Sequence, residues 1–321
     1  VEMGPQAGAD GGGYVVLDSG YYLVKNRLLI PSGVHLVGNG VANRHFKGRL
    51  ESTTLITEYG KDAEKTDHAF ITLEDDSALH NLCVYYPDQD AGDPVKYSPT
   101  VAVSGDDAQV SKNIFVGGYI NFYVTGENAL ISYARGLGLE AGFIAEGIES
   151  GRFEYMFFSI NDWMRSWDNE IPNAPPEGWQ NRYPNFENDT FVFENCKNVT
   201  LYHSFSYGQG TGVRLEGNIE NFHGIGVGID MGRHSLNLNN SGSGNVFVNT
   251  EFSSWENNIL ANESYSGETT FYVSSCWFSD NAVTSTFNGS GTVNIQQFHM
   301  QKGSFTANAG TVNLQVLLID G

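Results

Sequence analysis

Short runs in which apolar and polar residues alternate recur along the whole chain. Examples are HNLCVYY from His80, KNVTLYHSFSYG from Lys197, GNVFVNTEF from Gly244, TTFYVSSCWF from Thr269 and TVNLQVLLI from Thr311. Such alternation, bounded by glycine, asparagine and serine, indicates short strands joined by tight turns. The 38 glycines in 321 residues also favour many turns over long helices. The pattern therefore predicts an all-β protein with little helix.

The runs repeat at a nearly constant interval in the second half of the chain. Steps of 23, 24, 25, 22 and 19 residues separate the matched apolar positions, which are Val199, Phe222, Val246, Phe271, Val293 and Val312. A drifting period in the twenties, built from short strands and polar turns, is the signature of a solenoid. The sequence lacks the L-x-x-L-x-L frame of a leucine-rich repeat. We therefore predict a single-stranded right-handed parallel β-helix of roughly ten coils, forming one domain over residues 1–321.

The intervals are longer in the first half of the chain. Steps of 32, 39 and 46 residues separate Leu82, Ile114, Phe153 and Val199. Because stacked coils share one cross-section, the extra residues must leave the stack as loops. We therefore expect loop insertions in the N-terminal and middle coils, the largest at about residues 161–189.

The stretch GADGGGYVVLDSGYYLVKNRLLIPSGVHLVGNG, Gly8 to Gly40, resembles the first coil of pectin-lyase-like right-handed β-helix proteins. In that superfamily a glycine-rich turn, a G-x-Y strand and an I-P-x-x-V-x-L-x-G strand open the solenoid. The resemblance implies the β-helix fold and a glycan substrate. Polysaccharide lyases, glycoside hydrolases, epimerases and tailspike depolymerases all belong to this superfamily, so it fixes no single reaction. Only seven residues precede Gly8 here, so we do not expect them to form the amphipathic helix that usually precedes this coil in the superfamily.

The predicted insertion is rich in aromatic side chains. The stretch NDWMRSWDNEIPNAPPEGWQNRYPN, Asn161 to Asn185, holds three of the chain's five tryptophans and four prolines. Flat indole and phenol faces pack against the C–H faces of sugar rings, while their N–H and O–H groups remain able to bond hydroxyls. The alternative is that the loop folds back on the solenoid and the tryptophans form a small hydrophobic core within the loop.

Charge limits the classes of partner. The formal net charge is −20, with 17 Lys plus Arg against 37 Asp plus Glu. An acidic surface repels phosphate backbones and anionic lipid, so we expect no nucleic-acid and no membrane partner. High acidity also suits a secreted or extracellular protein. The three cysteines are far apart and form no metal-binding spacing.

Six of the nine arginines lie between residues 135 and 233, which suggests a locally balanced region suited to a polar ligand or to ion pairs. Glycosidic hydrolysis needs one protonated and one ionised carboxyl group. We expect Asp162 or Asp168, among aromatic neighbours, to be the protonated acid. We expect Asp230 to be kept ionised by the nearby positive charge of Arg233 and His234.

The predicted substrate-binding residues come from the insertion, from the arginine cluster and from the stretch GIDMGRHSLN. They are Trp163, Arg165, Trp167, Trp179, Tyr183, Arg214, Arg233 and His234. No metal ligand is predicted among them.

Three functions remain open. The first is a secreted glycoside hydrolase that cleaves a polysaccharide or oligosaccharide with a carboxylate pair and no cofactor. The second is a polysaccharide lyase that uses Ca²⁺ and a basic residue on a uronate glycan, as the resemblance implies. The third is a non-catalytic glycan-binding or tailspike-like adhesin. Net acidity favours the hydrolase, because an acidic protein repels a polyuronate.

The ends of a solenoid are exposed apolar edges that would template aggregation. We therefore expect either that a second copy covers them in a homo-oligomer or that the chain belongs to a longer polypeptide.

Overall fold

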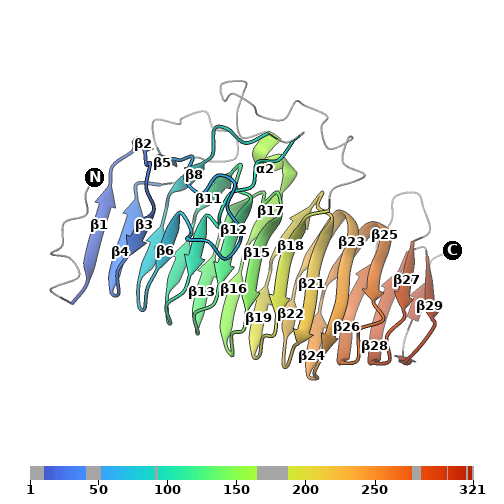
Figure 1. The fold of residues 1–321 in the computed structure, drawn as a ribbon. Coiled ribbons are helices and arrows are strands. Elements are labelled where there is room, and N and C mark those ends of the chain that lie inside the picture. Colours follow the sequence, from blue (N-terminus) through green and yellow to red (C-terminus); the bar gives the residue numbers. More distant parts are fainter. Residues whose placement is uncertain are drawn as a thin grey trace. The chain divides into compact units, whose positions relative to one another are not determined.

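A computed structural model gives the fold (Figure 1). The structure describes residues 11–40, 52–90, 93–164, 187–276, 283–301, 303–315 and 317–319. Strands account for 57% of the residues and helix for 1%, and the paired strands are parallel. The predicted all-β parallel β-helix is therefore confirmed. In the described part of the chain, no helix is long and apolar enough to cross a membrane.

The chain divides into two units, Val1–Ile144 with Met156–Arg182 and Ala145–Tyr155 with Tyr183–Gly321. The prediction of one domain over residues 1–321 stays a prediction. The elements of the first unit, in chain order, are β1 (Gly13–Leu17), β2 (Gly20–Leu23), β3 (Leu28–Ile30), β4 (Val34–Gly38), β5 (Thr53–Ile56), β6 (Ile71–Leu73), β7 (Ala78–His80), β8 (Cys83–Tyr85), β9 (Val101–Val103), β10 (Gln109–Ser111), β11 (Ile114–Val116), β12 (Ile120–Val124), β13 (Ala129–Ser132), β14 (Arg135–Gly136), β17 (Phe157–Ser159) and α2 (Ile160–Met164). β15 (Ala141–Glu146) holds residues of both units.

In the first unit each coil contributes one strand to each of three parallel ladders. One ladder runs β1, β4, β7, β10, β13, the next runs β2, β5, β8, β11, β14, β17, and the third runs β3, β6, β9, β12. Most of these strands take only three to five residues, so three of them fit in one short coil such as that from Gln109 to Leu130.

The second unit repeats this plan. Its elements are β16 (Gly151–Glu154), β18 (Asp189–Glu194), β19 (Val199–Tyr202), β20 (Phe205–Tyr207), β21 (Thr211–Asn218), β22 (His223–Ile225), β23 (Gly228–Ser241), β24 (Asn245–Val248), β25 (Glu251–Ala261), β26 (Glu268–Cys276), β27 (Thr284–Phe287), β28 (Thr292–Met300), β29 (Ser304–Ala307), β30 (Thr311–Leu314) and β31 (Leu317–Ile319). Ladder A stacks β16, β19, β22, β24 and the first halves of β26 and β28. Ladder B stacks β20, the starts of β23 and β25, the ends of β26 and β28, and β31. Ladder C stacks β18, β21, the ends of β23 and β25, β27 and β29.

Aromatic rings fill the interior of the second unit. Phe193, Phe222, Phe247, Phe271 and Phe298 are all at most 2% exposed. Successive ring centroids lie 4.9, 5.4, 5.3 and 6.3 Å apart, the range of favourable aromatic pairs. The ring stack binds each coil to the next.

The predicted register of the coils is correct at Val199–Phe222 and wrong in the middle. Asn245 and Thr269, rather than Val246 and Phe271, stack on Phe222, so the observed steps from Val199 are 23, 23, 24, 24 and 19. Matching apolar residues missed this because both true positions are polar yet buried.

A polar residue is stable at this position because it bonds the backbone. The Asn245 side chain accepts from the Phe222 N–H at 3.0 Å and donates to the Ile219 carbonyl at 2.9 Å. These two bonds satisfy turn groups that would otherwise be buried without partners. Asn113 does the same in the first unit, for Leu82 and Leu79.

The corner between ladders A and B has one residue in the left-handed region in successive coils of the described second unit. In the second unit these residues are Tyr155, His203, Gly226, Asn249, Val273 and Gln297, with φ between 44° and 63°. Glycine and asparagine adopt this conformation at little cost, whereas a β-branched residue such as Val273 is strained there.

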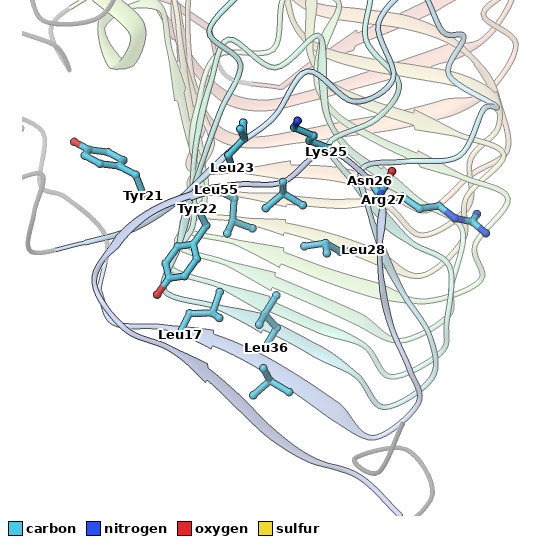
Figure 2. A pocket seen from close by; sticks show the side chains of 12 residues that line it. Leu17, Tyr21, Tyr22, Leu23, Lys25, Asn26, Arg27, Leu28, Leu36 and Leu55 are labelled. Carbon is cyan, nitrogen blue, oxygen red and sulfur yellow. The ribbon is translucent and has the colours of Figure 1, made fainter. Parts of the chain in front are cut away.

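The interior of the first coil contains an apolar hollow of about 550 Å³ (Figure 2). Leu17, Leu28, Leu36 and Leu55 point into it. The expectation that a second copy or a further segment of polypeptide covers the solenoid ends stays a prediction.

We predict that Asn245→Ala destabilises the protein by about 2–4 kcal/mol, because one buried N–H and one buried carbonyl lose their partners. Denaturant-induced unfolding measures the change. The control is Asn308→Ala, which removes an exposed side chain that bonds Asn288 at 2.8 Å, and it should shift stability by no more than about 0.5 kcal/mol. Equal effects of the two variants would contradict the role given to Asn245.

Candidate functional site

The predicted insertion begins at α2, directly after β17. The Asn161 N–H bonds the Ser159 hydroxyl at 3.1 Å, which starts the helix, and Asp162 follows in its first turn. The Asp162 side chain is buried, and its Oδ1 lies 2.9 Å from Nη2 of Arg135. The Arg135 guanidinium also lies over the Phe157 ring, 4.6 Å from its centroid.

This setting differs from the one that the sequence predicted for Asp162. An adjacent guanidinium favours the ionised carboxylate, whereas a general acid needs surroundings that keep its proton. The pair instead ties the start of the insertion to β14. Asp162 belongs to the first unit and Asp230 to the second, so their pairing in one groove stays a prediction.

Most of the insertion lies outside the described residues. The predicted site residues affected are Arg165, Trp167, Asp168, Trp179 and Tyr183, together with the side chain of Trp163. Their proposed roles stay predictions.

The insertion ends at the corner between ladders B and C. Asn188 is buried there, and its side chain accepts from the Gly210 N–H at 2.9 Å and donates to Oε1 of Gln209. The Gln209 carbonyl in turn accepts from the Arg233 N–H at 3.1 Å. The Gly210 carbonyl accepts from the His234 N–H at 2.8 Å. The end of the insertion is therefore fixed against the next two coils.

Two bulges interrupt the pairing of β23 with β25 at the same corner. In the first, Asp230 and Met231 on β23 oppose only Ser253, because Ile229 pairs with Phe252 and Gly232 with Ser254. Met231 has a φ of 57°, which turns the strand out of ladder B. A bulge re-aims the side chains beside it.

The second bulge is on β25. Gly232 pairs with Ser254 and His234 with Asn257, so Trp255 and Glu256 together oppose Arg233. Trp255 is 42% exposed although it sits within a strand. The bulge thus presents an indole ring and a carboxylate to solvent at the corner.

The sequence predicted that Arg233 and His234 hold Asp230 ionised, and the structure shows otherwise. Arg233 Nε lies 2.9 Å from Glu256, and its Nη1 lies 3.8 Å from Glu187. His234 Nε2 lies 3.7 Å from the same Glu256 carboxylate. The turn at Met231 separates Arg233 and His234 from Asp230, which explains the error. Burial lowers the pKa of His234, Glu256 acts against this, and Arg233 adds to it.

Arg214 is also engaged by carboxylates. Its guanidinium lies 3.0 Å from Asp189 and 3.7 Å from Glu216, within ladder C. Glu216 also accepts from the Asn239 side chain at 3.1 Å. Both predicted ligand-binding arginines of the second unit, Arg214 and Arg233, are therefore balanced by two acids each.

Asp230 has a close carboxylate neighbour, Glu251, on the outer face of ladder B. Glu251 pairs with Gly228, two residues before Asp230. Burial raises the pKa of Asp230, while bonds from the Ser253 hydroxyl and the Met231 N–H oppose the rise. Burial also raises the pKa of Glu251, and the charge of Asp230 raises it further. Two carboxyl groups therefore share one outer face, and the pKa of each is raised above its ordinary value.

Sequence reasoning missed Glu251, Trp255 and Glu256. A signal was present for Trp255 and Glu256, because WEN at Trp255 interrupts an alternating run with an apolar residue on the polar face. Among the described residues, no group of three or more His, Cys, Asp or Glu side chains is placed to hold a metal ion.

We predict that Asp230→Asn raises the free energy of unfolding at pH 7. The raised pKa means that the folded state binds the proton more tightly than the unfolded state, so the ionised side chain destabilises the fold. This penalty builds as pH rises from the unfolded-state pKa, about 4, through the folded-state pKa. The gain in the variant should thus shrink as pH falls toward 4, as measured by denaturant unfolding across pH. A loss of stability at pH 7 would contradict it.

Neither a protein-family model nor a curated protein sequence matches the chain. Solved structures do match. The DFA-IIIase of Arthrobacter chlorophenolicus A6 in complex with GF2 has a TM-score of 0.66 at 12% identity, over 92% of this chain and 83% of that chain. The Dettilon tailspike protein has a TM-score of 0.59 at 11% identity, over 94% of this chain and 63% of that chain.

The mannuronan C-5 epimerase A-module of Azotobacter vinelandii has a TM-score of 0.53 at 11% identity, over 98% of this chain and 90% of that chain. At these identities the likeness is one of fold and carries no residue over. The chain has the parallel β-helix fold that these proteins share.

Proposed function

We propose that the protein is a glycoside hydrolase whose catalytic groups are Asp230 and Glu251. The proposal depends on one observation. Two carboxyl groups with raised pKa values lie on one outer face, next to a corner where Trp255 is exposed. Solved structures of this fold include enzymes named for carbohydrate chemistry, which supports a glycan as substrate.

The two carboxyls suit opposite roles. Asp230 accepts bonds from Ser253 and Met231, which favour its ionised form, whereas the charge of Asp230 favours the protonated form of Glu251. Glu251 therefore serves as the general acid that protonates the leaving oxygen. Asp230 serves as the base that activates water. Neighbouring strands ~4.8 Å apart and a rise of ~3.3 Å per residue put the two Cα atoms about 8 Å apart. The proposed roles require about 6.5–9.5 Å between the two carboxyl groups themselves, which leaves room for water.

The charges around the corner favour an uncharged glycan. Glu187, Asp189, Glu216 and Glu256 outnumber the two arginines that they pair with. A uronate carboxylate would meet a net negative surface at this corner, as would the anionic intermediate of a lyase reaction. A neutral polysaccharide or oligosaccharide avoids this repulsion.

The aromatic insertion extends the proposed binding surface. Trp163, Trp167, Trp179 and Tyr183 are proposed as further sugar contacts because of the flat apolar faces of their side chains. Asp168 is retained as a candidate acid beside Glu251, and Asp162 is tested with it although its pair with Arg135 favours the ionised form. We also propose that the protein acts outside the cell, where polymeric glycans and an acidic surface are compatible.

Replacing the catalytic carboxyls should abolish most turnover. Asp230→Asn and Glu251→Gln should each lower kcat by ~10²-fold or more, the lower end of a general acid–base contribution. Reducing-end release from a panel of neutral and acidic polysaccharides measures turnover, and ultraviolet absorbance detects the unsaturated products of a lyase. The control is Glu263→Gln, an exposed acid beyond the corner.

Unsaturated products would favour the lyase, and binding without cleavage would favour the adhesin. Full activity of both carboxyl variants would refute the assignment. The same assay on Asp162→Asn and Asp168→Asn tests the acids of the insertion.

Truncating the exposed indole should weaken substrate binding. Trp255→Ala should raise KM by about tenfold with a smaller change in kcat, because a flat apolar face against a sugar ring contributes about 1 kcal/mol or more. Tyr14→Ala is the control, since Tyr14 is 72% exposed on the first strand of the other unit. An unchanged KM for Trp255→Ala would remove Trp255 from the binding surface.

A further inference from the structure

A second hollow of about 340 Å³ lies in the last described coils of the second unit, at the corner between ladders A and B. It is lined by backbone or side chains of Asn249, Val273, Ser275, Gln297, His299 and Leu318. Val273 and Leu318 are 56% and 58% exposed, so the walls combine apolar surface with amide, hydroxyl and imidazole groups. Such a mixture matches a sugar, which has C–H faces and hydroxyl edges.

The hollow lies on the same outer row of ladder B as Glu251. Glu251 pairs with Ser275, Ser275 with His299, and His299 with Leu318, all on the outer row of ladder B. A glycan whose cleaved bond lies at Glu251 therefore reaches the hollow by extending along the stack, one coil spacing of ~4.8 Å at a time.

Backbone strain singles out one wall of this hollow. Val273 has a φ of 49°, in the left-handed region, at the corner position that Gly226 and Asn249 occupy in the two preceding coils. For a β-branched residue this conformation is an outlier, and strained residues of this kind concentrate at ligand-binding positions. Asparagine would fit the same turn with less strain, as Asn249 does, so the turn itself does not require a valine side chain there.

We propose that this hollow is a distal subsite that binds the part of a neutral glycan chain extending from Glu251 toward the last coils. Val273 and Leu318 pack against the C–H faces of a sugar ring there, and Gln297 and His299 bond its hydroxyl groups. The proposal rests on the proposed glycoside hydrolase function and adds a preference for longer chains.

The test compares the dependence of affinity on glycan length in wild type and variants. The probes are malto-, cello- and inulo-oligosaccharides from disaccharide to octasaccharide, titrated calorimetrically into the full chain. We expect wild-type affinity to rise with length within the series that binds. Val273→Asn should raise the melting temperature and lower affinity for the longest oligosaccharides by about tenfold, the effect of roughly one small apolar contact. His299→Ala, which does not alter the turn, should lower the same affinities.

The matched control is Tyr133→Asn. Tyr133 occupies a corner turn of the first unit with a φ of 54°, so this variant should also raise the melting temperature while affinity stays unchanged. If Val273→Asn and His299→Ala bind every length as wild type does, the subsite is refuted while the hydrolase proposal stands. If wild type binds none of these oligosaccharides and cleaves no polysaccharide, the proposed function fails and the subsite fails with it.

Discussion

The structure depends on the stacking of parallel coils in constant register. Each coil gives its backbone N–H and carbonyl groups to the coils before and after it, so every strand position is repeated by its partner along the ladder. Inward positions must then be filled in every coil, as the phenylalanine stack from Phe193 to Phe298 shows. Extra residues can leave the stack only at corners. This constraint decides where variation, and therefore chemistry, is possible.

The proposed function uses the freedom that the corners leave. At the corner between ladders B and C, two bulges on neighbouring strands turn Asp230 and Trp255 outward without breaking the interior contacts of Ile229 and Phe252. Burying a carboxyl costs stability, which is why the pKa of Asp230 is raised. The strain at Val273 is a cost of the same kind at the other corner. The fold tolerates the buried carboxyl of Asp230 and the strained backbone of Val273 because the stacked interior supplies most of its stability.

Periodicity was enough to predict the fold, since strand alternation and the repeat interval both follow from how the interior is filled. It was not enough to predict the register at Asn245 and Thr269, because a buried amide that bonds the turn looks like a surface residue in sequence. The proposed site shares Asp230 with the site predicted from the sequence. The partners of Asp230 differ, because proximity in sequence suggested Arg233 and His234 whereas stacking supplied Glu251. Glu251 is 21 residues from Asp230, and only the observed register brings the two together.

The most direct test of this account is a crystal structure of the Asp230→Asn protein with an oligosaccharide from the polysaccharide that the wild type cleaves. In this complex a glycosidic oxygen should lie within hydrogen-bond distance of Glu251, and a sugar ring should stack on Trp255. An oligosaccharide bound elsewhere on the solenoid, with Glu251 and Trp255 exposed to solvent, would contradict it.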